Sequence, residues 1–372
     1  MIDYHLLLSV LIGVSILIIL ILKFKIQPFL GLLISSILVG VLAGVAPLEI
    51  MNTVKEGMGS TLGFVAVVVG LGAMFGAILE HSGGAEALAQ YLLKAFGEKN
   101  ASWALMITGF FIAIPVFFDV AFIILIPLVY SLQRKTKKSM LLYAIPLLAG
   151  LAITHAFIPP TPGPVAVADI LNADLGWVIL VGFIVGIPTA IVSGPIFGKF
   201  IASKIFIAAP KKIDEKVVDN FPPIHLILSI IATPILLIVL NTLLNSPLGS
   251  SLNLSDKTTT WLQMIGHPFS ALIIANLMAW YLLGIRRGVS KAILSKITSA
   301  SLAPAGIIIL LTGAGGVFKQ MLITTGTGEM LANYFSSIGL SVLLFSFLAA
   351  VCVRILQGSS TVAMITAAGI TS

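Results

Sequence analysis

The dominant pattern along the chain is a series of long apolar runs separated by short polar segments. About 20 consecutive apolar residues are needed for a helix to cross a bilayer. The pattern therefore predicts an all-α polytopic membrane protein. The expected spans are Leu6–Leu22, Pro28–Val45, Leu62–Leu79, Leu141–Ile158, Trp177–Phe200, Ile224–Leu244, Leu262–Gly284 and Leu302–Ile323.

Two further apolar segments, Ala101–Leu132 and Gly339–Ser372, are interrupted and do not read as simple spans. The first is too short for two crossings and too broken for one. It predicts a re-entrant helical hairpin at about residues 101–132, which enters and leaves on the same side of the membrane.

Pro115 and Asp119 lie in the middle of that hairpin. Proline removes a helical hydrogen bond, and a carboxylate at membrane depth costs roughly 2.5–3.5 kcal/mol on insertion scales. Two costly features this close together indicate a binding site. The plainer interpretation is that Asp119 caps a helix beginning at Val120.

Composition and charge support a membrane protein, because 58% of the residues are hydrophobic and 9% are charged. The net charge is 21 − 14 = +7, and the basic residues sit in short loops. We interpret this excess as a topology signal rather than nucleic-acid binding. Placing the basic loops inside puts the N-terminus outside; these loops are Lys23/Lys25, Arg134–Lys138, Lys199–Lys216 and Arg286–Lys296.

A repeat organises the chain. Shifted by 243 residues, Gly70–Tyr91 falls on Gly313–Tyr334 with 9 identities in 22 positions, where roughly two are expected by chance. The loop assignment gives the two copies opposite orientations, so we predict inverted repeats. Short interfacial helices, Leu48–Gly59 and Val289–Ala300, are expected before one span of each copy.

The expected division is an N-terminal half at 1–200, a cytoplasmic linker at 201–223 and a C-terminal half at 224–372. The C-terminal half lacks a counterpart of residues 134–200. This predicts a fragment of a protein of roughly 440 residues.

Four places could carry chemistry. Besides the Asp119 hairpin, the counterpart segment Arg354–Thr361 offers a guanidinium for a carboxylate, together with the amide of Gln357, Gly358 and the hydroxyls of Ser359, Ser360 and Thr361. The alternatives are that Arg354 snorkels or pairs with Asp119, and that the hydroxyls only cap a helix.

The third place is Thr154–Asp169, where the proline-rich break at 159–164 cannot continue a helix. Its freed carbonyls could face a polyol or an ion, and His155 could relay a proton. Alternatively, His155 is an interfacial hydrogen-bonding residue. The fourth place comprises the glycine-rich stretches 70–76 and 313–316, for which close helix packing is favoured over substrate contact.

The sequence contains no HExxH, CxxC or P-loop motif. We therefore expect no catalytic residues, metal or cofactor, and no enzyme. The lone cysteine, Cys352, excludes an intrachain disulfide.

At PVFFDV, HAFIPPTPGP and QGSSTVAMITAAG the chain resembles the gluconate:proton symporter (gluconate permease) family over essentially its whole length. The resemblance implies a proton-coupled importer in the cell (inner) membrane for gluconate or a similar small hydroxy-carboxylate. It also implies a scaffold, a moving transport domain and often a homodimer. By motif it assigns to the site Pro115, Phe118, Asp119, His155, Pro160, Gly163, Pro164, Gln357, Gly358 and Ser359.

One position departs from the family: many members carry histidine where this chain has Thr161, which leaves the proton relay and the exact substrate open. We expect the two broken elements to meet near the midplane. Arg354 and helix N-termini would hold the carboxylate there, and Asp119, or else His155, would carry the proton. Hydroxyls of the substrate would bond to Gln357, Ser359, Thr154 and Thr161.

Three alternatives remain from the sequence. The substrate could be another small acid, such as D-serine or a keto or hydroxy sugar acid. The protein could be a passive organic-anion channel, which would dissipate a gradient. An intramembrane enzyme would need a nucleophile and base at a recognisable spacing.

Overall fold

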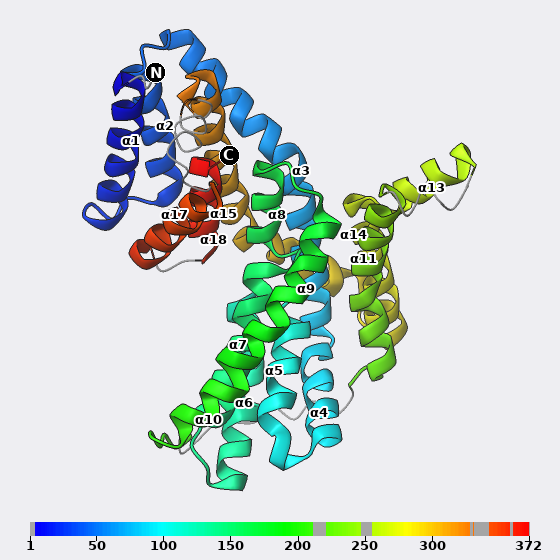
Figure 1. The fold of residues 1–372 in the computed structure, drawn as a ribbon. Helices are drawn as coiled ribbons and strands as arrows, with labels where there is room; N and C mark the ends of the chain where they lie inside the picture. Colours follow the sequence, from blue (N-terminus) through cyan, green and yellow to red (C-terminus); the bar gives the residue numbers. More distant parts are fainter. Residues whose placement is uncertain are drawn as a thin grey trace. The chain divides into compact units, whose positions relative to one another are not determined.

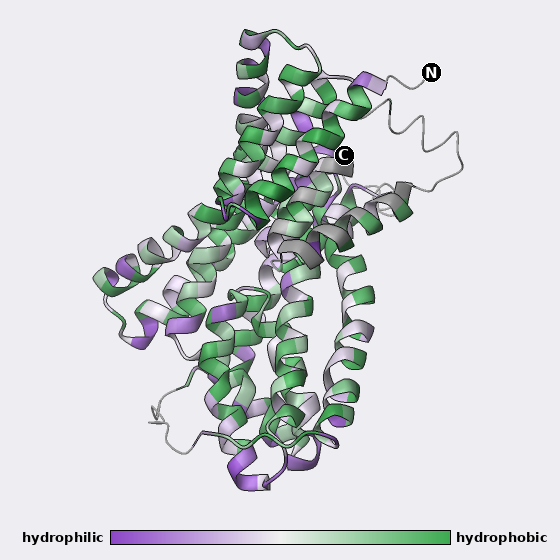
Figure 2. Cartoon of the chain, turned by 90° about the vertical axis from the view of Figure 1, so that its left-hand side faces the viewer, coloured by the Kyte–Doolittle hydropathy of each residue, from purple (hydrophilic) through white to green (hydrophobic). Residues whose placement is uncertain are grey.

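The computed structural model describes residues 4–210, 221–246, 255–327, 330, 342–357 and 360–371. Every regular element in this part of the chain is helical, which confirms the all-α class (Figure 1). Among the described residues, 7 helices are long and apolar enough to cross a membrane. Figure 2 shows apolar helices with hydrophilic residues gathered toward their ends and connecting segments, the distribution a bilayer imposes.

The chain forms two compact units. Unit 1 comprises 1–67, 162–173 and 304–372, and unit 2 comprises 68–161 and 174–303. Each unit takes segments from both predicted halves. The halves, which are defined by the repeat, stay a prediction.

Unit 1 packs its helices around one apolar cluster. Leu32, Val39, Phe318 and Ile365 belong to this core, and each is at most 1% exposed. Its elements are α1 (Tyr4–Leu22), α2 (Pro28–Leu42), the first part of α3 (Pro47–His81), α8 (Pro162–Ile170), the second part of α15 (Lys291–Thr324), α17 (Val342–Gln357) and α18 (Ser360–Thr371).

Unit 2 is built around the tight pair α5 (Ala101–Ile112) and α7 (Leu141–Phe157). Gly109 and Gly150 allow this approach, since a Cβ on either would collide with backbone of the other helix. The remaining elements are the second part of α3, the first part of α15, α4 (Gly84–Phe96), η1 (Glu98–Asn100), α6 (Phe118–Thr136), α9 (Leu175–Ile191), η2 (Val192–Ile196), α10 (Phe197–Ala202), α11 (Ile224–Leu244), α13 (Asp256–Gly266), α14 (Pro268–Ala279), η3 (Trp280–Gly284) and η4 (Ile285–Arg287).

The repeat is visible in the helices themselves. Helix α3 ends at His81 and α15 ends at Thr324, which differ by 324 − 81 = 243 residues. Gly83 and Gly326, also 243 apart, both adopt left-handed backbone, with φ of 74° and 69°. Glycine tolerates this conformation without strain, so both copies turn at the same point. The inverted orientation of the copies stays a prediction.

Three predicted boundaries were wrong. The expected interfacial helices Leu48–Gly59 and Val289–Ala300 are not separate, because α3 and α15 each continue from these segments into the span. Where each expected interfacial helix joins its span, only Pro304 removes a helical hydrogen bond, and α15 continues through it. The expected span Leu262–Gly284 is divided at His267, where α13 ends and Pro268 begins α14.

Asp174 joins α9 to α11 in unit 2. Its carboxylate accepts the backbone N–H groups of Gly176 and Trp177, both at 3.0 Å, and the hydroxyl of Thr242 at 2.6 Å. We expect Asp174→Ala to lower the free energy of unfolding by about 2–3 kcal/mol, since a cap is lost and the buried Thr242 loses its acceptor. Asp174→Asn keeps an acceptor oxygen and should retain most of the stability. Thermal unfolding in detergent measures both, and equal losses would contradict the capping role.

Candidate functional site

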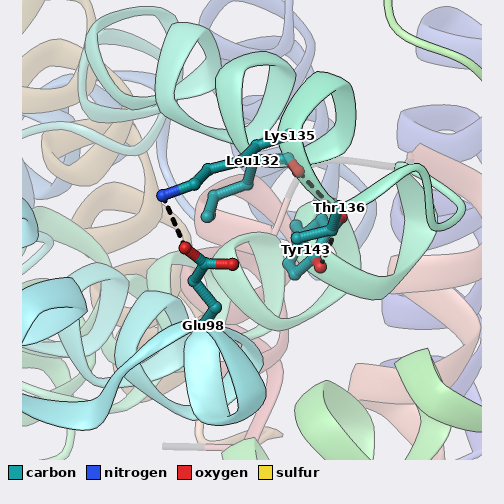
Figure 3. A network of polar contacts seen from close by, with 5 residues as sticks. All are labelled: Glu98, Leu132, Lys135, Thr136 and Tyr143. Carbon is teal, nitrogen blue, oxygen red and sulfur yellow. Dashed lines mark hydrogen bonds and ion pairs between the residues drawn. The ribbon is translucent and has the colours of Figure 1, made fainter.

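The interrupted segment between Gly97 and Ser139 forms two helices whose outer ends meet. Lys135, near the end of α6, pairs with Glu98, just before α5, at 2.5 Å (Figure 3). Tyr143 on α7 donates to Thr136 Oγ1 at 2.9 Å and fixes the same end of α6. The two helices therefore form a helical hairpin, and its re-entrant placement in the membrane stays a prediction.

Residues 113–117 separate the two helices and form the tip of the hairpin. Pro115 is buried there, and its carbonyl lies against Gly76 of α3 so closely that a Cβ at Gly76 would collide with it. Asp119 lies in the first turn of α6, is exposed, and follows the helix start at Phe118. The interpretation that Asp119 caps a helix beginning at Val120 was therefore wrong. Its charge still suits the positive end of the helix dipole.

The last turn of α7 faces this tip. The rings of Phe118 and His155 lie 6.5 Å apart, and the charge of Asp119 acts on His155. Thr154 is 0% exposed, and neither its Oγ1 nor His155 Nδ1 has a hydrogen-bond partner among the described residues. Buried polar atoms usually find partners, so two orphans beside a carboxylate are consistent with a site that binds a polar ligand.

The proline-rich break is shorter than predicted. Irregular backbone covers only residues 158–161, and Pro162, Gly163 and Pro164 form the first turn of α8. Proline is tolerated there because the first N–H groups of a helix have no intrahelical acceptor. Thr161 is buried and donates to the carbonyl of Ile158 at 2.6 Å, so its hydroxyl hydrogen is already engaged.

In the break itself, the peptide bond between Pro159 and Pro160 is cis. The Pro160 carbonyl lies near Gly72, 3.6 Å from where a Cβ would stand. This contact and that of Gly76 with Pro115 place both breaks of unit 2 against the glycine-rich stretch of α3. The prediction of close packing is confirmed for both glycine stretches: Gly316 likewise packs against Gly57 and Thr61 in unit 1.

The remaining predicted residues belong to unit 1. Gly163 packs against the start of α18, 3.7 Å from Thr361 Cα to a Cβ placed on the glycine. Thr361 is buried, Ser360 half-buried, and Arg354 lies exposed in the last turn of α17 rather than in the break. Gly358, Ser359 and the side chain of Gln357 lie outside the described residues. Because Asp119 and Arg354 belong to different units, their expected meeting stays a prediction.

Two polar residues within apolar helices, Asn276 and Lys319, were not singled out from the sequence. Asn276 of α14 donates to the carbonyls of Leu71 and Leu272, at 2.9 and 2.8 Å. Lys319 of α15 donates to the Ile170 carbonyl, close to Asp169. Lys319 could have been found from the sequence, because it is a single cation within the apolar run Leu302–Ile323, where an ionisable residue is costly.

Glu86 of α4 gives unit 2 a pH-dependent stability. Burial raises its pKa; a backbone hydrogen bond opposes this, and the nearby Glu80 carboxylate adds to it. Folding raises the pKa of Glu86 and therefore favours its protonated form. The contribution of Glu86 to the free energy of unfolding is fully present below pH 4.5, the ordinary pKa, and is lost as the pH rises through the raised pKa of the folded protein. Glu86→Gln should remove this decline, as thermal unfolding from about pH 4 to about pH 8 can show. Identical pH profiles for the variant and the parent would contradict it; Glu98→Gln, at an exposed carboxylate, is the control.

The long apolar helices of the described residues define a multi-pass membrane protein. Residues 5–372 match the family described as GntP family permease. The chain belongs to this family of permeases.

Curated relatives match over nearly all of this chain. A gluconate permease of Pseudomonas aeruginosa is 37% identical over 373 residues, which cover 99% of this chain and 82% of that protein. The low-affinity gluconate transporter of Escherichia coli (strain K12) is 40% identical over 362 residues, 96% of this chain and 80% of its own length. The Gnt-II system L-idonate transporter of the same strain is 34% identical over 361 residues, 96% and 81% respectively.

Proposed function

We propose that this permease imports gluconate, or a closely similar hydroxy-carboxylate, together with protons. The substrate class rests on the relatives, two of which are named for gluconate and one for L-idonate. Both are small polyhydroxy acids with one carboxylate, so the shared chemistry is an anion carrying several hydroxyls. Transport rather than catalysis is the function that a permease family supports.

Proton coupling is supported by the cluster of Phe118, Asp119 and His155, which lies where two helices are interrupted. A carboxylate and an imidazole within electrostatic reach can exchange a proton in the physiological range. In the proposal, protonation of Asp119 removes its charge and permits inward movement of the loaded protein, with His155 as the alternative carrier. Thr154 and Thr161 are proposed to accept substrate hydroxyls. Pro115, Pro160, Gly163 and Pro164 shape the interrupted backbone around the substrate.

The second broken element contributes the anion-binding groups in this proposal. Arg354 and the start of α18, with Ser360 and Thr361, are assigned to the carboxylate. Gln357, Gly358 and Ser359 are assigned to the same role from the sequence motif. We also propose a cell-membrane location with the N-terminus outside, and a homodimer.

Uptake of labelled gluconate into proteoliposomes with an imposed pH gradient tests the function. Accumulation above the external concentration, abolished by an uncoupler, is expected for proton symport; equilibration without accumulation would indicate a passive channel instead. Competition by keto relatives of gluconate, glycerate and D-serine then ranks the substrates. Stronger competition by D-serine than by gluconate would overturn the substrate assignment and leave the transport mechanism intact.

A further inference from the structure

Lys319 is a charged residue in an otherwise apolar part of α15. Its neighbours Val317, Phe318 and Met321 are each at most 1% exposed and belong to the packed interior of unit 1. An ammonium group in such a place needs partners, and ionisable residues within membrane spans usually mark a functional path. The repeat places Lys319 where the other copy has Gly76. The lysine is thus a feature of the second copy alone.

The ammonium group of Lys319 completes the end of α8. Backbone N–H groups of the following turn donate hydrogen bonds to the carbonyls of Val167, Ala168 and Asp169. The next carbonyl, that of Ile170, accepts from Lys319 Nζ instead. A cation at this position also suits the negative end of the helix dipole. Because an ammonium has three donors, Lys319 keeps further hydrogen-bonding capacity beyond this contact.

Asp169 supplies the opposite charge. It lies one residue before Ile170, is half-buried like Lys319, and interacts electrostatically with it. With the carboxylate ionised, the pair is neutral overall. With the carboxylate protonated, the pair carries one positive charge, which is the condition that attracts an anion.

Other charged groups around this pair are few. Helices α18 and α2 contain no titratable residue. Helix α3 presents Thr53, Gly57 and Thr61 to α15, while its Lys55 and Glu56 are exposed. On α17, Arg354 is exposed. Within the described part of unit 1, the local charge therefore depends on Asp169 and Lys319.

We propose that Asp169 and Lys319 form a proton-linked anion site, in which protonation of Asp169 frees Lys319 to bind the carboxylate of the transported acid. One proton is taken up by the Asp169 carboxylate and one anion binds at the ammonium, so the pair returns to neutrality without any covalent change. The inference rests on the proposed transport of a small carboxylate. The two ionisable sites have different parts in the proposal: Asp169 controls when the anion binds, and Asp119 controls when the protein moves, so accumulation requires both.

The test measures gluconate affinity against pH, as the gluconate-dependent shift in thermal unfolding, and accumulation in proteoliposomes. In the parent protein, affinity should fall up to about tenfold per pH unit once Asp169 ionises. Asp169→Asn, which resembles the protonated acid, should bind gluconate with an affinity that no longer depends on this ionisation. It should also accumulate less. Lys319→Gln should weaken binding at least about tenfold, and Lys319→Arg should restore part of it.

The double variant Asp169→Asn/Lys319→Gln separates this site from a structural ion pair. A structural pair predicts that removing both charges restores accumulation, and that result would overturn the inference. A proton-linked site predicts a folded double variant with weak binding that no longer depends on the ionisation of Asp169. An unchanged pH profile in Asp169→Asn would overturn it equally. Failure of the parent protein to transport any small carboxylate is a different result, which would overturn the proposed function itself.

Discussion

Asparagine in place of Asp119 is expected to abolish proton-driven accumulation of gluconate while leaving exchange across the membrane intact. Asparagine preserves the size and the hydrogen-bonding oxygen of the side chain but cannot bind a proton at physiological pH. Substrate can then still bind beside Phe118 and His155, and the loaded protein can still move. The link to the proton is lost because the group that changes charge is gone.

Vesicles with an imposed gradient of one pH unit make the effect quantitative. One proton per anion permits about tenfold accumulation, equivalent to about 1.4 kcal/mol. The parent should reach at least this ratio, because Asp169 is proposed to take up a proton as well, and Asp119→Asn should stay near one. Glu98→Gln is the matched control, since it removes a carboxylate from an exposed ion pair that contributes little. Unchanged accumulation in Asp119→Asn would reject Asp119 as the proton carrier, and loss in His155→Asn alone would transfer the role to His155.

Gly76→Ala is expected to destabilise unit 2 more than any other addition of a single methyl group in that unit. Its Cβ would collide with the Pro115 carbonyl, which is backbone at the tip of the hairpin and cannot rotate away. Over-packing typically costs about 1–3 kcal/mol, and a clash with backbone belongs at the upper end. The tip would have to shift, and Asp119, four residues further along, would shift with it. We expect both stability and uptake to fall severely.

Gly63→Ala on the same helix provides the control. A Cβ at Gly63 meets no atom within 4 Å, and alanine is the better helix former by roughly 0.5–1 kcal/mol. This variant should be as stable as the parent or slightly more stable. Thermal unfolding and gluconate uptake of the two variants decide the matter. Equal behaviour of Gly63→Ala and Gly76→Ala would contradict the close approach of α3 to the hairpin tip.

The length of the apolar runs and the cost of burying backbone polar groups were enough to determine an all-α membrane protein. The hairpin was predictable for the same reason, since Pro115 and Asp119 are too costly for an ordinary span. The repeat was evident from the similarity of two stretches of the sequence 243 residues apart. The ends of α3 and α15, at His81 and Thr324, have the same spacing. These features depend on local sequence and on general membrane physics.

Only the tertiary structure decided what each interruption contacts. The sequence predicted that Pro162–Pro164 interrupt a helix, because proline in a helix interior removes a hydrogen bond. In the structure these residues form the first turn of α8, where proline is tolerated, and the irregular backbone covers only residues 158–161. The hydrogen bond from Lys319 to the Ile170 carbonyl joins residues 149 positions apart. Apolar periodicity sets which residues are buried, but long-range packing sets which of the buried polar groups meet.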